Sequence, residues 1–133
     1  HISSNHRAFA AVLDTGDVVT WGETTCGGDS TSVQEKLTGI NRKVNHIYCT
    51  DYAFAALLEN GGVVTWGEPS HGGDSSAVQN KLNGERKVSR IYSTGYAFAA
   101  VLEGGGVVTW GDAGCGGDSC AVQEKLSGSQ EVK

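Results

Sequence analysis

Three residues with metal-binding or nucleophilic side chains stand at equivalent places in a sequence that repeats itself. Cys26, His71 and Cys115 each come directly before a Gly-Gly pair. Thiolate and imidazole groups are zinc ligands, so a Cys-His-Cys zinc site would form if the three loops converged on one axis. In most arrangements of successive repeats such loops stay far apart, and a loop position of varying composition is the simpler interpretation. We therefore expect neither a metal nor a cofactor.

The sequence Gly-Gly-Asp-Ser follows this position in all three copies, at residues 27–30, 72–75 and 116–119. A calcium site needs six to eight oxygen ligands, and each copy supplies one carboxylate without acidic neighbours. A nucleophilic serine needs a base, and no histidine recurs beside these serines. We interpret the aspartates as caps that accept backbone N–H groups at the start of a short helix. The candidate binding positions are therefore loop residues only: Cys26, Asp29, His71, Asp74, Cys115 and Asp118.

Tyrosines gather at the end of one expected strand in the second and third copies. They are Tyr48, Tyr52, Tyr92 and Tyr96, and His6 and Arg7 stand at the corresponding place in the first copy. Aromatic residues with arginine suit a protein-binding rim. Half-buried packing of a turn is the competing interpretation.

The composition excludes several classes of protein. The 133 residues carry a net charge of −5, and the ten Lys and Arg residues are scattered singly. Because a nucleic-acid binder needs a concentrated basic face, we expect no nucleic-acid partner. No apolar run approaches the roughly 20 residues that span a bilayer, so we expect no transmembrane segment. Since the sequence begins with His1 rather than Met, we expect that processing or truncation removed a preceding segment.

The four cysteines are too few and too irregularly spaced for a disulfide scaffold. Free thiols in a reducing intracellular compartment are the expected state. Cys49 replaces Ser4 and Ser93 of the other copies, and a buried thiol is the expected environment. A local disulfide between Cys115 and Cys120 is the alternative for that pair.

A threefold internal repeat provides the elements that must position these loops. The tryptophans at 21, 66 and 110 are 45 and 44 residues apart, and the phenylalanines at 9, 54 and 98 keep the same spacings. The one-residue difference falls in a linker, where stacked supersecondary units tolerate it. We expect a single repeat domain over residues 1–133, with repeats at 1–43, 44–87 and 88–131.

Each repeat predicts three strands and a short helix. In the second repeat, Val44–Tyr48 is rich in β-branched and aromatic residues, which favours a strand. Ala53–Leu58 is apolar at both alternating sets of positions, as expected of a strand covered on both sides. Asn60-Gly61-Gly62 predicts a tight turn into a third strand, Val63–Trp66. Asp74–Leu82 has good capping residues and predicts a helix of about two turns, with an irregular edge strand as the alternative.

The two ends of the chain complement each other in sequence. Val132-Lys133 begins the first strand of a further unit, and His1-Ile2 matches the second half of the same strand. Two arrangements are consistent with this pattern. The ends meet and complete one sheet, or neighbouring repeats of a longer array complete it.

The repeated order of motifs resembles the RCC1 repeat. The motifs are V-x-x-I at 44–47, an apolar strand, G-x-V-x-W-G at 62–67 and Gly72-Gly73, with counterparts in the other copies. The resemblance implies blades of a β-propeller and a scaffold that binds proteins. The sequence departs from the family in having Gly-Gly-Asp-Ser where Gly-Gln-Leu-Gly is usual, and in having three units where seven are common. The predicted helix replaces the usual outer segment.

We therefore expect an all-β fold with short helices, built of RCC1-like blades, that acts as a non-enzymatic interaction or scaffold module. An accessory subunit of a larger assembly is one form of this function, with unidentified protein partners or further repeats bound to it. Six aromatic residues are expected to form the core between units: Phe9, Trp21, Phe54, Trp66, Phe98 and Trp110. The alternative is a carbohydrate-binding domain with a threefold β-trefoil or β-prism fold.

Overall fold

The chain forms three separate antiparallel sheets of three strands each, one from each repeat. The computed structural model describes residues 1–39, 42–128 and 132. The first sheet holds β1 (Ile2–Ser4), β2 (Ala8–Val12) and β3 (Val18–Gly22). The second holds β4 (Val44–Cys49), β5 (Ala53–Leu58) and β6 (Val63–Gly67), and the third holds β7 (Val88–Ser93), β8 (Ala97–Leu102) and β9 (Val107–Gly111). The predicted strands are confirmed.

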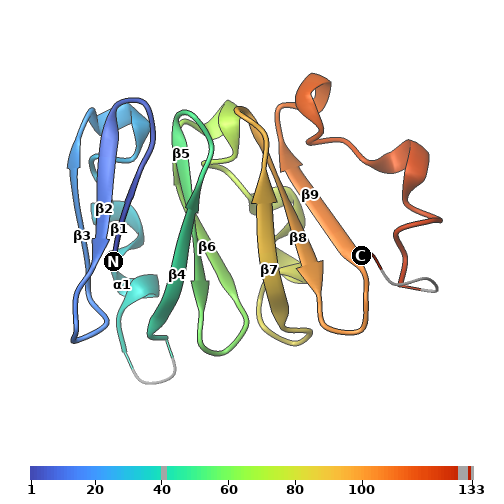
Figure 1. The fold of residues 1–133 in the computed structure, drawn as a ribbon, viewed down its shortest axis with the longest axis horizontal. Coiled ribbons are helices and arrows are strands. Elements are labelled where there is room, and N and C mark those ends of the chain that lie inside the picture. Colours follow the sequence, from blue (N-terminus) through green and yellow to red (C-terminus); the bar gives the residue numbers. More distant parts are fainter. Residues whose placement is uncertain (40–41, 129–131, 133) are drawn as a thin grey trace.

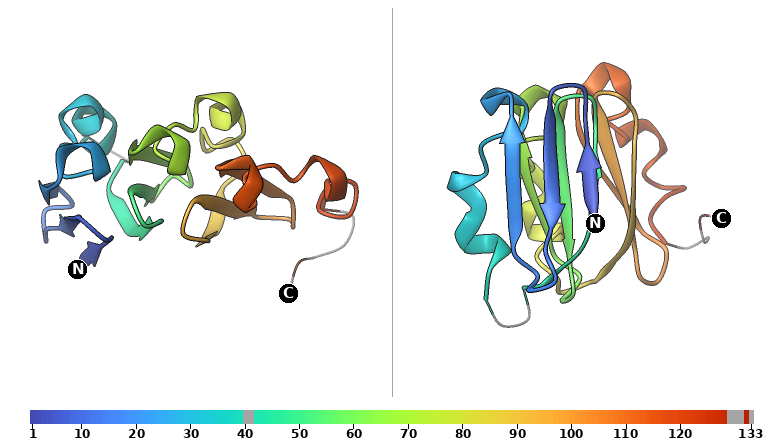
Figure 2. Two further views of the ribbon diagram at one scale, coloured as in Figure 1. Left: turned by 90° about the horizontal axis from the view of Figure 1, so that it is seen from above. Right: turned by 60° about the vertical axis from the view of Figure 1, so that its left-hand side comes forward.

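The sheets stand side by side in a row, with the first and third repeats at its ends (Figure 1; Figure 2, left, from above). These three antiparallel sheets confirm the expected all-β class with short helices. A β-trefoil or β-prism would place the units around a threefold axis, so the alternative fold is wrong. The carbohydrate-binding function that depended on that fold loses its support with it.

The middle strand of the second sheet shows why the sheets pack face to face. All six residues of β5 are buried. Phe54, Ala56 and Leu58 contact the first repeat, and the alternate residues Ala53, Ala55 and Leu57 contact the third. Since successive side chains of a strand point to opposite faces, one apolar strand contributes to two inter-sheet cores.

Most of the predicted helix is instead a 3₁₀ helix, which is wound more tightly than an α-helix. In the second repeat it is η4 (Ser76–Lys81), and the first repeat combines η2 (Thr31–Val33) with a single α-helical turn, α1 (Gln34–Leu37). The third repeat has η6 (Cys120–Val122). A bond to the neighbouring strand constrains this segment, because the N–H of Val63 donates to the carbonyl of Leu82 and holds the end of the segment against β6.

A second short turn precedes each Gly-Gly pair. These turns are η1 (Thr24–Cys26), η3 (Pro69–His71) and η5 (Ala113–Cys115). Each ends at a glycine with φ near +100°, a conformation that side chains with a Cβ rarely adopt. The Gly-Gly pair therefore closes the turn and directs the chain toward the aspartate.

The six aromatic residues expected in the core occupy two environments. The side chains of Phe54, Trp66, Phe98 and Trp110 are at most 4% exposed. Phe9 and Trp21 of the first repeat are each 44% exposed, because no described element covers the outer face of the first sheet. They stack on each other with ring centroids 5.2 Å apart, in the same pairing as the buried Phe54 and Trp66.

The expected strand at Val132-Lys133 falls partly outside the described residues, since Lys133 is not among them. Its closure onto His1 and Ile2, and the repeat boundaries at 43, 87 and 131, stay predictions. Among the described residues, no helix is both long and apolar enough to cross a bilayer.

Candidate functional site

At the position of Cys26, His71 and Cys115, the contact shared by all three repeats is a hydrogen bond to the backbone carbonyl. The carbonyl of Cys26 accepts a hydrogen bond from Asn5 at 2.8 Å, and that of His71 accepts one from Thr50 at 2.8 Å. The carbonyl of Cys115 accepts one from the third repeat at 3.0 Å. Any residue supplies this carbonyl, which explains why the side chain varies. Within residues 1–39, 42–128 and 132, no three His, Cys, Asp or Glu side chains are placed to hold a metal ion.

The three loop aspartates close local turns. A carboxylate oxygen of Asp29 accepts the N–H of Thr31 at 3.0 Å, and Asp74 accepts that of Ser76 at 2.9 Å. Asp118 accepts the N–H of Cys120 at 3.0 Å. Hydrogen bonds from the residue two positions on hold the pKa of all three carboxyls below its ordinary value. Each aspartate therefore closes an Asx turn one residue before the N-cap serine and is not itself the predicted cap. One oxygen of each carboxylate already accepts a hydrogen bond.

A hydrogen-bond network behind these loops was not predicted from the sequence. In the second repeat the hydroxyls of Thr65 and Ser75 lie 2.8 Å apart, and Ser75 donates to Gln79 at 2.7 Å. The amide nitrogen of Gln79 donates to the carbonyl of Val63 at 3.0 Å, which ties the segment to β6. Thr, Ser and Gln recur at these positions in every repeat, and that recurrence was the available signal. Because Ser75 is buried in this network, it has a structural role rather than that of a nucleophile.

The four cysteines are free thiols. Cys115 and Cys120 form no disulfide. Cys49 donates from its sulfur to the carbonyl of Ser4 in the preceding repeat at 3.1 Å. Burial, and then the charge of Asp51, raise the pKa of Cys49, so this thiol is a poor nucleophile.

An aromatic cluster lies where the ends of the first strands meet the loops before Gly-Gly. We call His6, Tyr52, His71 and Tyr96 the aromatic rim. The ring of Tyr52 lies 5.7 Å from that of His6 and 5.1 Å from that of His71, and His71 lies 4.7 Å from Tyr96. His6 also contacts the carboxylate of Asp51 at 3.3 Å. Three repeats contribute to this one surface.

Of the candidate loop residues, His71 and Cys26 belong to this surface. A cavity of about 270 Å³ opens beside the rim, and both residues line it with Tyr52. Arg7, Glu23 and Glu68 complete its charged edge. The expected tyrosine cluster divides, since Tyr52 and Tyr96 join the rim whereas Tyr48 packs against the core between the second and third sheets.

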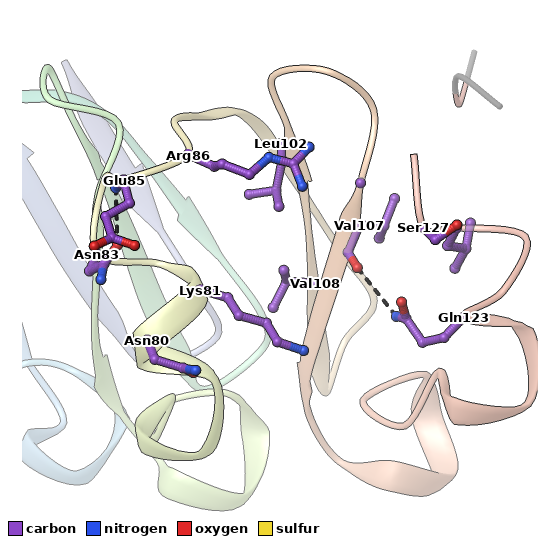
Figure 3. A pocket seen from close by; sticks show the side chains of 12 residues that line it. Asn80, Lys81, Asn83, Glu85, Arg86, Leu102, Val107, Val108, Gln123 and Ser127 are labelled. Atoms are coloured by element: carbon purple, nitrogen blue, oxygen red, sulfur yellow. Dashed lines mark hydrogen bonds between the residues drawn. The ribbon is translucent and has the colours of Figure 1, made fainter. Parts of the chain in front are cut away.

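Two further hollows lie between repeats. A groove between the first two repeats is lined by Asp29, Asp74 and Trp66, among others. A cavity of about 320 Å³ lies between the second and third repeats, where Lys81 and Arg86 approach apolar residues of the third sheet (Figure 3). Gln123 lines it while donating to the carbonyl of Val107 at 3.2 Å.

Comparisons with known proteins give a fold rather than a family. No family model and no curated protein matches the chain. Human WBSCR16 is similar in structure, at 20% identity and a TM-score of 0.55 over 100% of this chain and 37% of that one. Yeast RCC1 (Prp20), in its complex with Kap60, is similar at 19% identity and a TM-score of 0.58, over 84% of this chain and 31% of that one.

The ectodomain of the Physcomitrella patens receptor kinase CR4 is similar at 18% identity and a TM-score of 0.54, over 83% of this chain and 28% of that one. The chain thus spans about a third of the length of each of these structures. At such identities the likeness concerns the path of the backbone. What the geometry and the comparisons establish together is that this chain has the fold of RCC1-like propeller blades.

Proposed function

We propose that the chain is a non-enzymatic protein-interaction module that binds its partner through the aromatic rim, and that it serves as an accessory subunit of a larger assembly. The observation that carries this proposal is the convergence of Tyr52, His71 and Tyr96 from two neighbouring repeats on one surface. Tyrosines supply a large contact area with few rotatable bonds, which makes them frequent anchors of protein interfaces.

The surroundings of the rim favour a protein partner. Arg7 and the glutamates at 23 and 68 stand at the edge of the neighbouring cavity and provide charges of both signs. Interfaces typically combine such a polar edge with an aromatic centre. The candidate residues Cys26 and His71 contribute to this surface, whereas the loop aspartates have the local structural role described above.

Proteins with similar blades bind other proteins. One solved structure shows yeast RCC1 (Prp20) bound to Kap60, and another concerns the binding of Prp20p to Gsp1p and histones. Kap60, Gsp1p and histones are partners of yeast Prp20. They support an interaction role for the present blades without identifying its partner.

The experiment begins with affinity capture on the tagged chain, followed by direct titration of the purified partner by calorimetry. Tyr52→Ala is expected to weaken binding by roughly 30-fold, as loss of an anchor worth about 2 kcal/mol would do. Glu35→Ala is the control, because Glu35 is an exposed residue of the first repeat outside the rim. Equal affinities of the two variants would remove the rim from the interface.

The accessory-subunit role has its own test. In sedimentation of an extract of the source cells, the chain should migrate in stoichiometric amount with a large complex. Tyr52→Ala should shift it to the fractions of the free chain. Migration of the unaltered chain as a free species would contradict this role while leaving binding to a smaller partner intact.

A further inference from the structure

The outer face of the first sheet is a preformed apolar surface with nothing described against it. Ile2, Phe9 and Trp21 are 63%, 44% and 44% exposed, whereas their equivalents Ile47, Phe54 and Trp66 are 2%, 0% and 3% exposed. Phe9 and Trp21 hold the stacked geometry of the buried pairs. The face therefore has the composition and shape of an inter-repeat contact that lacks its other half.

The outer face of the third sheet is the opposite half of the same contact. An added Cβ on Gly27 would lie 2.4 Å from the ring of Phe54, and one on Gly72 would lie 2.5 Å from the ring of Phe98. No described atom lies within 4 Å of such a Cβ on Gly116, although its φ of +104° matches the others. The space over Gly116 is therefore open. In the first two repeats, the corresponding space over the glycine is filled by the phenylalanine ring of the following repeat. We call the open space over Gly116 the seat.

The apolar residues around this seat are uncovered as well. Tyr92 and Val122 are 56% and 47% exposed. Ala99, on the same face of the sheet, is partly exposed, whereas its equivalent Ala55 is fully buried. Both ends of the row therefore leave apolar area in contact with water.

The unpaired polar groups at the two ends are complementary, because one end has a hydrogen-bond donor and the other has the acceptor. Within the chain, Trp66 donates to the carbonyl of Gly27 and Trp110 to that of Gly72, both at 3.1 Å. At the ends, the indole N–H of Trp21 and the carbonyl of Gly116 have no partner among the described residues. A donor is left on the first repeat, and the corresponding acceptor is left on the third.

A series of backbone hydrogen bonds between successive repeats also leaves one unpaired group at each end. The N–H of His6 donates to the carbonyl of Asp51 at 3.1 Å, and the N–H of Asp51 donates to that of Gly95 at 2.9 Å. The carbonyl of His6 and the N–H of Gly95 are left over in the described part of the chain. Each unpaired group on one end face finds its counterpart on the other.

We propose that the chain associates head to tail with a second copy of itself, the outer face of the first repeat seating on the outer face of the third. Phe9 of one copy fills the space over Gly116 of the next, and Trp21 donates to the Gly116 carbonyl. The contact repeats the two boundaries already present within the chain. Because it joins two different faces, it is heterologous and can extend to further copies or close into a ring.

A second copy is the occupant that the structure supports, because only another surface of this repeat type carries the space over Gly116, the acceptor and the donor at the required positions. An unrelated partner could cover the apolar area but has no reason to reproduce both sets of hydrogen bonds. Further repeats on the same polypeptide would use identical chemistry, and the length of the polypeptide found by immunoblotting the source cells separates them from a second copy.

The test is analytical ultracentrifugation of the 133-residue chain over a range of concentrations. We expect a mass that rises with concentration in multiples of the monomer. Trp21→Arg and Ala99→Arg, one on each face, should each weaken self-association by at least tenfold. Ala77→Arg, at an exposed alanine of the middle repeat, is the matched control and should associate like the unaltered chain. Circular dichroism verifies that each variant is folded.

Mixing the two face variants distinguishes head-to-tail from face-to-face contact. The Trp21→Arg chain keeps an intact third-repeat face, and the Ala99→Arg chain keeps an intact first-repeat face. The mixture should therefore form a discrete 1:1 dimer that neither variant forms alone. A chain that stays monomeric at high concentration overturns the proposal. So does a mixture that forms no dimer.

Discussion

The indole nitrogen of Trp66 donates a hydrogen bond of 3.1 Å to the carbonyl of Gly27, 39 residues earlier in the chain. The bond crosses the boundary between the first and second repeats and is buried beside the ring of Phe54. Trp110 makes the same bond to Gly72 at the next boundary. The tryptophans of the second and third repeats thus each bond to the repeat before them.

Replacing Trp66 by phenylalanine tests the energetic weight of this bond. Trp66→Phe removes a buried donor, strands the Gly27 carbonyl and leaves a small cavity, and should cost about 2 kcal/mol of unfolding free energy. Trp21→Phe, at the exposed equivalent, should cost less than about 0.5 kcal/mol. Urea unfolding at a concentration where the chain is monomeric measures both. Equal losses would contradict the role assigned to the boundary.

Glycine substitutions separate backbone strain from crowding at the same boundary. Gly27→Ala and Gly116→Ala both place an alanine at φ near +100°, which costs about 1–2 kcal/mol in each case. Only Gly27→Ala also places a Cβ 2.4 Å from Phe54, and overpacking of that kind adds roughly 1–3 kcal/mol. Gly27→Ala should therefore lower the free energy of unfolding by about 2 kcal/mol more. Similar costs would mean that Phe54 moves aside freely.

The architecture was predictable from the sequence because its signals are periodic. Ala53–Leu58 is apolar at every position, and the structure buries every one of its residues between two neighbouring sheets. The tight turn at Asn60-Gly61-Gly62 followed from the need for positive φ, and Gly61 has a φ of +84°. Such features depend on a few neighbouring residues, which a sequence displays directly.

Two features were not predictable for physical reasons. The position of Cys26, His71 and Cys115 suggested zinc chemistry, but its shared contact uses a carbonyl that every residue possesses. The segment at 74–82 has helical capping residues, but its bonds to β6 through Gln79 and Leu82 override local propensity and leave it 3₁₀. The aromatic rim was predicted in part, through Tyr52 and Tyr96, but the addition of His71 and the loss of Tyr48 depend on contacts between repeats.

Gln79 offers a test of the network that the sequence analysis missed. Gln79→Met keeps the length of the side chain and removes its bonds to Val63 and Ser75. We expect a loss of about 1–2 kcal/mol in unfolding free energy, because both partners are left without their bond. Asn80→Met is the matched control, since exposed Asn80 makes no side-chain hydrogen bond to the described residues. A comparable loss in the control would assign the effect to helix propensity.

The turn at Asp74 predicts a dependence of stability on acid. Hydrogen bonds from Ser76 hold the folded pKa of Asp74 below its ordinary value of 3.8, so the stabilisation is complete above that pH. It is lost as the pH falls below 3.8 and through the lower folded pKa. Asp74→Asn keeps the acceptor oxygen without titrating, so its melting temperature should fall less between pH 5 and pH 2.5.

The control for this titration is Asp14→Asn, at an exposed aspartate that accepts no hydrogen bond from the described residues. Its melting temperature should follow that of the unaltered chain. A parallel fall of the Asp74→Asn and unaltered curves would show that the carboxylate form of Asp74 contributes no stability to the turn.

Asp118 has a second effect, on the thiol at the start of η6. Its carboxylate accepts a hydrogen bond from Cys120, and this bond together with the negative charge raises the pKa of Cys120. Because the thiolate is the reactive form, Asp118→Asn should accelerate alkylation of Cys120 by iodoacetamide at pH 8. Cys115 is the internal control, since its pKa is raised by burial and then by Asp112 rather than by Asp118. Peptide mapping by mass spectrometry resolves the two sites. Equal acceleration at both cysteines would point to local unfolding of the loop instead of the loss of one charge.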